Sequence, residues 1–266
     1  FRVGPLGTMH RFANPGRFMR LVDRLQPWLL WGAVALLPFG LFKALIDSPA
    51  DYQQHDTVRI LYIHVPAALL AQGAYVLMAL GSASFLIWKH PLGDLSARAV
   101  APIGAVFCLI CLVTGSVWGK PTWGTYWVWD ARLTSMLILF FLFVGYIALA
   151  NAFDDPARGD KPAAILAVVG IVNIPVIKFS VYFFNTLHQQ STLMSEGGPA
   201  MPPEMLVPLA LMMAALSLLF LWLFAVRLRG EFAKVRLRAI RSGLVRRADR
   251  QAGDGTNDGG LAEGAR

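Results

Sequence analysis

The sequence predicts an all-α integral membrane protein with six transmembrane helices and with both the N and C termini in the cytoplasm. Hydrophobic residues make up 56% of the 266 residues and charged residues only 15%, which is more apolar than an ordinary soluble domain. The apolar residues gather in blocks of about 20, the length that an α-helix needs to cross roughly 30 Å of hydrocarbon. Basic residues cluster before the first block and after the last.

Each apolar block is long enough to cross a bilayer, and the second is long enough to tilt or to project beyond it. The predicted spans are about 28–46, 61–88, 101–118, 133–153, 163–184 and 206–226. This membrane domain, 28–226, lies between a basic cytoplasmic segment, 1–27, and a basic cytoplasmic tail, 227–266. From about Gln251 the tail is rich in Gly and Asp, a composition that is typical of disorder.

The basic residues also predict the orientation, because short cytoplasmic loops carry an excess of Lys and Arg. The two termini and the short segments 89–98 and 154–162 carry most of the cations, so we expect them in the cytoplasm. The segments 47–60, 118–132 and 184–205 hold several Asp and Glu but only three cations, so we expect them on the other side. The net charge of +8 is therefore concentrated beside the membrane, and this placement argues against a nucleic-acid partner.

The two cysteines, Cys108 and Cys111, are spaced C-x-x-C inside the third span. A thiolate in hydrocarbon with no cation beside it is disfavoured. The sequence therefore predicts that both cysteines pack as small apolar residues and form neither a redox nor a metal site.

The most informative segment for function is 118–134, which the sequence predicts to begin as an extracytoplasmic loop. Within twelve residues it contains Trp118, Trp123, Tyr126, Trp127 and Trp129. One or two such rings are typical of the aromatic belt at a membrane surface. This many rings, together with two glycines that allow a close approach to the backbone, favour a flat apolar platform for a large planar hydrophobic ligand.

The stretch from Trp123 to Thr134, W-G-x-x-W-x-W-D-x-R-L-T, resembles the signature tryptophan-rich (WWD) motif of the haem-handling proteins of cytochrome c maturation. The motif is long and specific, and the similarity runs from about Arg20 to Arg229. Within that superfamily the chain most resembles the small six-helix CcmC family. The resemblance implies a protein that is not an enzyme. It implies transient, non-covalent binding of haem b (iron protoporphyrin IX) at the periplasmic side of the bacterial inner membrane.

The resemblance also implies partners for this chain. They are a membrane-anchored periplasmic haem chaperone that receives the haem, ABC-type ATPase and permease subunits, and a small single-helix membrane subunit. Any dependence on ATP would come from a partner, because this sequence contains no Walker A loop. The residues that we expect to contact haem are Trp118, Trp123, Gly124, Tyr126, Trp127, Trp129, Asp130 and Arg132.

Two histidines are candidate ligands of the haem iron. Pro66 places His64 near the start of the second span, and His188 follows the fifth span on the same side of the membrane. From the residues alone, each is more typical of a hydrogen-bonded structural histidine than of a ligand. The sequences H-V-P-A-A and N-T-L-H-Q around them resemble the two axial-histidine contexts of the family, which implies that both bind iron. His55 is a weaker alternative.

The propionates of haem would need cationic partners, and three cations are available outside the cytoplasm: Arg59, Lys120 and Arg132. Arg suits such a role because its planar fork binds both oxygens of a carboxylate. Pairing between Arg132 and Asp130 is an equal alternative. Asp130 is also a candidate for orienting the loop or a partner, and the sequence does not decide between these roles.

Other classes of protein fit the sequence less well. The main alternative is a permease subunit of an ABC transporter that exports haem or another solute. Lys43 and Lys178 are the intramembrane charges that would favour it, but both can extend to the membrane surface from near a helix end. A b-type electron-transfer cytochrome would need histidine pairs inside the bundle, which the spans do not offer. The loops contain no nucleophile and base pair for an enzyme.

Overall fold

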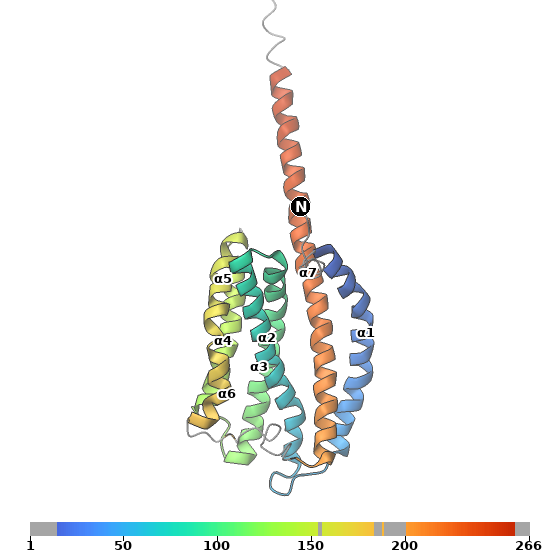
Figure 1. The fold of residues 1–266 in the computed structure, drawn as a ribbon, viewed down its shortest axis with the longest axis vertical. Coiled ribbons are helices and arrows are strands. Elements are labelled where there is room, and N and C mark those ends of the chain that lie inside the picture. The colour runs from blue at the N-terminus through green and yellow to red at the C-terminus, as the bar shows by residue number, and fades with distance from the viewer. Residues whose placement is uncertain (1–14, 154–155, 184–187, 189–200, 259–266) are drawn as a thin grey trace, which may run out of the picture. The chain divides into compact units, whose positions relative to one another are not determined.

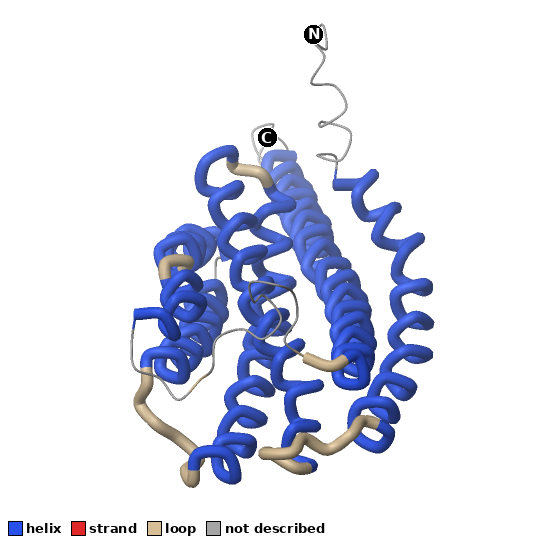
Figure 2. The backbone as a smooth tube through the Cα atoms, turned by 60° about the horizontal axis from the view of Figure 1, so that its bottom comes forward, coloured by secondary structure: helices blue, strands red, loops and turns tan. Residues whose placement is uncertain are grey.

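The computed structural model describes residues 15–153, 156–183, 188 and 201–258. The named elements of this part of the chain are all helices (Figures 1 and 2). Six helical stretches are long and apolar enough to cross a membrane. The predicted fold class and number of spans are therefore confirmed, and the chain is a multi-pass membrane protein. By its contacts the chain divides into two units, Phe1–Leu228 and Arg229–Arg266.

Nine helical elements follow one another along the described part of the chain. Those of the first half are α1 (Pro15–Phe42), the π-helical turn η2 (Lys43–Asp47), the 3₁₀ turn η3 (Asp56–Ile60), α2 (Leu61–Trp88) and α3 (Pro91–Trp123). Those of the second half are α4 (Ala131–Asn151), α5 (Pro156–Gly170), α6 (Asn173–Phe183) and α7 (Pro203–Asp258). The fifth span comprises most of α5 together with α6. α7 continues to Asp258, beyond Gln251, where the sequence predicted that disorder begins.

Two hydrophobic clusters hold the first unit together. The larger is formed by α2 to α6 with a contribution from α7, and in it the rings of Tyr75 and Phe143 are fully buried with their centroids 5.2 Å apart. The smaller cluster joins η2 to the starts of α2 and α7 through buried side chains such as Tyr62 and Met212. α7 thus contributes to both clusters, through Met212 to the smaller and through Phe220 to the larger.

Large apolar side chains also cover the outside of the helices. Trp31 on α1, Phe141 on α4 and Val169 on α5 are each at least 60% exposed. A water-soluble protein rarely exposes so many large apolar residues, whereas a bilayer surrounds them with lipid.

A largely buried group of charges joins α3, α4 and α5 at one end of the bundle. Arg98 forms ion pairs with Asp94 and Asp160 and donates a 3.1 Å hydrogen bond to the carbonyl oxygen of Ala150. The sequence predicted turns at 89–98 and 154–162, and these limits were wrong, because α3 begins at Pro91 and α5 has begun by residue 156. Hydropathy ends a span at the first charge, but these charges pair with one another and the helices continue through them.

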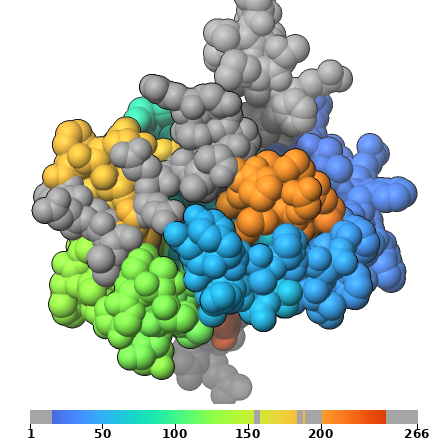
Figure 3. Space-filling model, turned by 90° about the horizontal axis from the view of Figure 1, so that it is seen from below, coloured from blue at the N-terminus to red at the C-terminus, as the bar shows by residue number. Residues whose placement is uncertain are grey.

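The opposite end of the first unit positions the site. The segments 48–60, between α1 and α2, and 124–130, between α3 and α4, lie at this end together with the start of α7 (Figures 1 and 2). Figure 3 looks onto this end and shows these segments in blue, green and orange. The sequence predicted an aromatic loop at 118–132, but α3 continues to Trp123, so the first part of that segment is helical.

Candidate functional site

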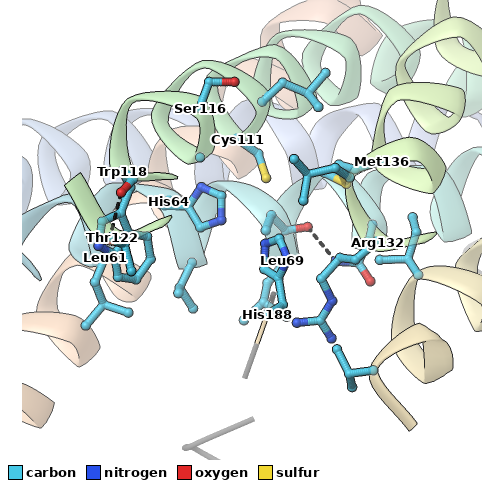
Figure 4. Close-up of a pocket in the computed structure, with 18 of the residues that line it drawn as sticks. Leu61, His64, Leu69, Cys111, Ser116, Trp118, Thr122, Arg132, Met136 and His188 are labelled. Carbon is cyan, nitrogen blue, oxygen red and sulfur yellow. Dashed lines mark hydrogen bonds between the residues drawn. The ribbon is translucent and has the colours of Figure 1, made fainter. Parts of the chain in front are cut away.

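A pocket of about 370 Å³ lies among α2, α3, α4, α6 and the start of α7 (Figure 4). Its volume is within the range of small-molecule sites, and its wall contains apolar side chains such as Leu61, Val65 and Leu209. Both predicted iron ligands line the pocket, His64 from α2 and His188 from the segment after α6. Figure 4 shows the two imidazoles near each other, although they come from different elements.

His64 lies in the first turn of α2, as the position of Pro66 predicted. Its Nδ1 is 3.1 Å from Oγ1 of Thr114, and its ring packs edge-on against Trp118 with the centroids 5.7 Å apart. The ring also lies against Gly115, where an added Cβ atom would come within 2.8 Å of Cε1 of His64. Two packed helices, α2 and α3, therefore hold this imidazole in one position.

His188 is held by Asp130 and Trp123. Its Nδ1 lies 3.3 Å from Oδ2 of Asp130, and its ring meets the indole of Trp123 with the centroids 4.9 Å apart. Burial lowers the pKa of His188, and the nearby Asp130 carboxylate opposes this shift without cancelling it. The imidazole is therefore neutral at pH 7, which is the form that binds a metal.

Asp130 also begins α4 as its N-cap. Its Oδ1 accepts a 2.7 Å hydrogen bond from the backbone N–H of Leu133, which satisfies a donor that the helix itself leaves unpaired. Within the described residues Asp130 therefore pairs with Leu133 and His188, and not with Arg132, which was the alternative that the sequence left open.

The five predicted aromatic rings do not all reach the pocket. Trp118, Trp123 and Trp127 line it. Tyr126 and Trp129 are outside its lining and are 59% and 76% exposed. Trp129 packs edge-on against Trp127, with 5.5 Å between the ring centroids. The structure thus brings three of the five rings together around one cavity.

Gly124 ends α3, and its backbone conformation requires a glycine. Its φ of +78° lies in the left-handed region, which residues with a Cβ atom rarely adopt. The N–H of Gly124 donates to the carbonyl oxygen of Lys120, and Nζ of Lys120 donates to the carbonyl oxygen of Gly124, both at 3.0 Å. The helix stops here, and the connection that follows carries Trp127 into the pocket lining.

The three predicted propionate partners differ in position. Arg132 lines the pocket. Its Nε is buried without a hydrogen-bond partner in the described part of the chain, and the same holds for Nε1 of Trp127. Arg59 is outside the pocket lining and donates to the carbonyl oxygens of Leu45 and Ser48 at 3.0 Å each. Its Nε is likewise buried without a hydrogen-bond partner in the described residues. Nζ of Lys120 donates to the carbonyl oxygen of Gly124 at the end of α3 and lies 5.3 Å from the centre of the Tyr126 ring.

Several residues of the site were not predicted from the sequence. Thr114 and Gly115 contact His64, and Gln54 accepts a 2.8 Å hydrogen bond from Nε1 of Trp118. Thr114 lies one helical turn before Trp118, so a search for polar residues at that spacing would have found it. The pocket lining also includes Cys111, Met136 and Lys178. Both cysteines are buried and form no disulfide.

The sequence is similar to known proteins over most of its length. The family described as "Heme exporter protein C" matches residues 8–242. A protein of that name from Bradyrhizobium diazoefficiens is 47% identical over 233 residues, which are 88% of this chain and 88% of the relative. The one from Escherichia coli strain K12 is 46% identical over 222 residues, 84% and 89% of the two chains. The one from Paracoccus denitrificans is 42% identical over 234 residues, 88% and 97% of the two chains.

The residues matched by the family, 8–242, span the tryptophan-rich segment and both histidines that line the pocket. Identity above 40% along most of both chains leaves one conclusion: this chain belongs to the heme exporter protein C family.

Proposed function

We propose that this protein binds haem in the pocket, at the periplasmic side of the inner membrane, and passes it to a membrane-anchored haem chaperone. The observation that carries the proposal is the meeting of His64 and His188 at one pocket with an apolar wall. Two imidazoles are too few to complete the coordination of a bare metal ion. They suit haem iron, because the porphyrin supplies its other four ligands.

The remaining chemistry of the pocket also suits haem. Trp118, Trp123 and Trp127 offer large apolar rings to a macrocycle. Nε of Arg132 and Nε1 of Trp127 are buried donors without a partner in the part of the chain that is described. A propionate would supply the missing acceptors, and a buried donor gains most when its hydrogen bond is completed.

The proposed orientation follows from the positions of the cations. Segments 48–60 and 124–130, which lie at the pocket end, contain one basic residue, Arg59. At the other end of the bundle, Lys89 lies between α2 and α3, and Arg158 and Lys161 lie in the first turns of α5. Short loops rich in Lys and Arg remain in the cytoplasm. The pocket therefore faces the periplasm, and both termini are cytoplasmic.

In this proposal haem is cargo. The relatives' name, heme exporter, supports a role in which haem leaves the protein again. The chaperone receives it, and ABC-type ATPase and permease subunits with a small single-helix subunit complete the assembly. Mixing haem-loaded protein with the purified chaperone, and measuring haem in each after separation, tests this step. Haem that stays entirely with the loaded protein would argue against transfer.

The binding step is tested with protein purified in detergent from haem-replete cells. The absorption spectrum of the wild type is compared with those of His64→Ala and His188→Ala. His55→Ala is the matched control, because His55 lies in the α1–α2 connection and is outside the pocket lining. We expect a six-coordinate low-spin spectrum in the wild type and the control, and its loss or conversion in the other two variants. A wild type without haem, or unchanged spectra in both variants, would favour a permease subunit for another solute.

A further inference from the structure

We propose that Asp130 and Thr114 hold the two histidines with hydrogen bonds of unequal strength, so that His188 is the stronger ligand of the haem iron and His64 the weaker one. This inference rests on the proposed function, because it concerns the same pair of ligands. Asp130 and Thr114 act as positioning residues, since each touches a histidine through Nδ1.

The proton of His188 is placed by Asp130. An ionised carboxylate only accepts hydrogen bonds, so Nδ1 of His188, 3.3 Å from Oδ2 of Asp130, carries the proton. The lone pair is then on Nε2, the nitrogen that a metal would bind. The side chains are only 19% exposed for His188 and 7% for Asp130, so water weakens this contact little. A carboxylate in such a position makes an imidazole a stronger donor toward a metal.

The proton of His64 is placed by neutral groups. The hydroxyl of Thr114 has one proton and donates it to the carbonyl oxygen of Ile110 at 2.6 Å, so its oxygen accepts from Nδ1 of His64 at 3.1 Å. The carbonyl oxygen of Cys111 lies 3.2 Å from the same hydroxyl. Nε2 again carries the lone pair. Neutral acceptors form weaker hydrogen bonds than a carboxylate does, so His64 is the weaker ligand.

Asp130 needs both of its oxygens for this arrangement. Oδ1 caps α4 through the N–H of Leu133, and Oδ2 accepts from His188. An Asn side chain has one acceptor oxygen and one donor NH₂ group. If its oxygen keeps the cap, its NH₂ faces Nδ1 of His188 and selects the tautomer whose Nε2 carries the proton. In that tautomer Nε2 has no free lone pair for the iron.

A difference in strength between the two iron–histidine bonds determines which bond is replaced first when haem is released. A ligand that competes for the iron displaces the weaker bond at a lower concentration, so His64 is exchanged while haem remains on His188. The single variants test this order. His188→Ala should bind haem roughly tenfold more weakly than His64→Ala, because loss of a hydrogen-bonding partner of a ligand typically changes affinity 10- to 100-fold. Equal affinities, or the reverse order, would overturn the proposal.

Two pairs of variants separate positioning from folding. Asp130→Ser keeps a side chain that caps α4 but is too short to reach His188 as well, and Asp130→Asn keeps the size of the side chain. Thr114→Val removes the hydroxyl, whereas Thr114→Ser retains it. Each full-length protein is loaded with haem, and its spin state and reduction potential are measured beside the melting temperature of the haem-free form.

We expect Asp130→Asn to lose the low-spin spectrum. We expect Asp130→Ser to raise the reduction potential of the haem iron, because a weaker imidazole donor stabilises ferric iron less. Thr114→Val should change the potential in the same direction by less, and Thr114→Ser should match the wild type. Wild-type spectra and potentials in both Asp130 variants, with a lowered melting temperature, would show that Asp130 is only a helix cap. That result would leave the proposal that His64 and His188 bind the iron unchanged. Unchanged spectra in His64→Ala and His188→Ala would instead contradict both the proposed function and this inference.

Discussion

Nε1 of Trp118 donates a 2.8 Å hydrogen bond to Oε1 of Gln54, and this bond joins the α1–α2 connection to α3. Trp118 also packs edge-on against His64. The surroundings of a proposed iron ligand therefore depend on two side chains that are 64 residues apart in the sequence.

Gln54→Leu tests the importance of this bond. The substitution leaves the indole N–H of Trp118 without its acceptor, which costs about 1 kcal/mol for a partly buried donor. We expect the haem dissociation constant to rise about fivefold, as measured by titration of the purified protein with haem. Gln53→Leu is the matched control, because Gln53 is the exposed neighbour. Equal losses of affinity in the two variants would show that the bond has no specific role.

Gly115→Ala tests whether His64 is a ligand without changing the histidine itself. The added Cβ would lie 2.8 Å from Cε1 of His64, so the imidazole must move away from its position against α3. We expect loss of the six-coordinate low-spin spectrum. Gly73→Ala on α2 is the control, since a Cβ atom there meets nothing within 4 Å. If Gly115→Ala keeps the wild-type spectrum, the position of His64 does not govern the coordination.

Arg132→Ala tests the proposed partner of the propionates. A lost hydrogen bond to a charged group costs about 1.5–3 kcal/mol, so affinity for haem should fall roughly 10- to 100-fold. Affinity for haem dimethyl ester, which lacks the carboxylates, should change little. Lys120→Ala removes a cation that is bound at the end of α3 and should affect neither ligand. Equal losses for haem and for its ester would mean that Arg132 acts on something other than the propionates.

The pH dependence of binding tests the state of His188. Burial lowers its pKa below the ordinary value of 6.5, so the folded protein keeps this imidazole neutral while an unfolded chain takes up a proton. Below about pH 6.5, His188 takes up a proton in the unfolded chain but not yet in the folded protein, so acid favours the unfolded chain. At still lower pH, His188 of the folded protein is protonated as well, and the proton competes with iron for the imidazole. Affinity for haem should be constant from about pH 8 to 6.5 and decline only below that range. A decline that begins between pH 7.5 and 6.5 would contradict the lowered pKa.

The fold was predictable in its outline, because a bilayer imposes a length and a composition on every span. Six spans were predicted, and the described part of the chain contains six helical stretches that could cross a membrane. The ends of the helices were not predictable from hydropathy. The start of α3 contains Asp94 and Arg98, and only the folded chain shows that Arg98 also pairs with Asp160, 62 residues away. Such pairing lets a helix continue through charges at which an apolar block stops.

Residues of the site that belong to a recognisable sequence motif were predictable, whereas residues that reach the site only through helix packing were not. His64, His188 and Arg132 all line the pocket, but the motif does not show that Trp129 is exposed while Trp127 is part of the lining. Both tryptophans lie in the connection that follows the end of α3 at Gly124. Gly115 carries no signal of its own, and the spacing of Thr114 from Trp118 does not reveal its contact with His64, which appears only when α2 is placed against α3.

The most direct test of the proposed site is the structure of the haem-bound protein. We expect the iron to lie in the pocket, bound on its two faces by Nε2 of His64 and Nε2 of His188 at about 2 Å each, with a propionate at Arg132. Haem bound elsewhere, or an iron that contacts neither of these histidines, would contradict the central claim.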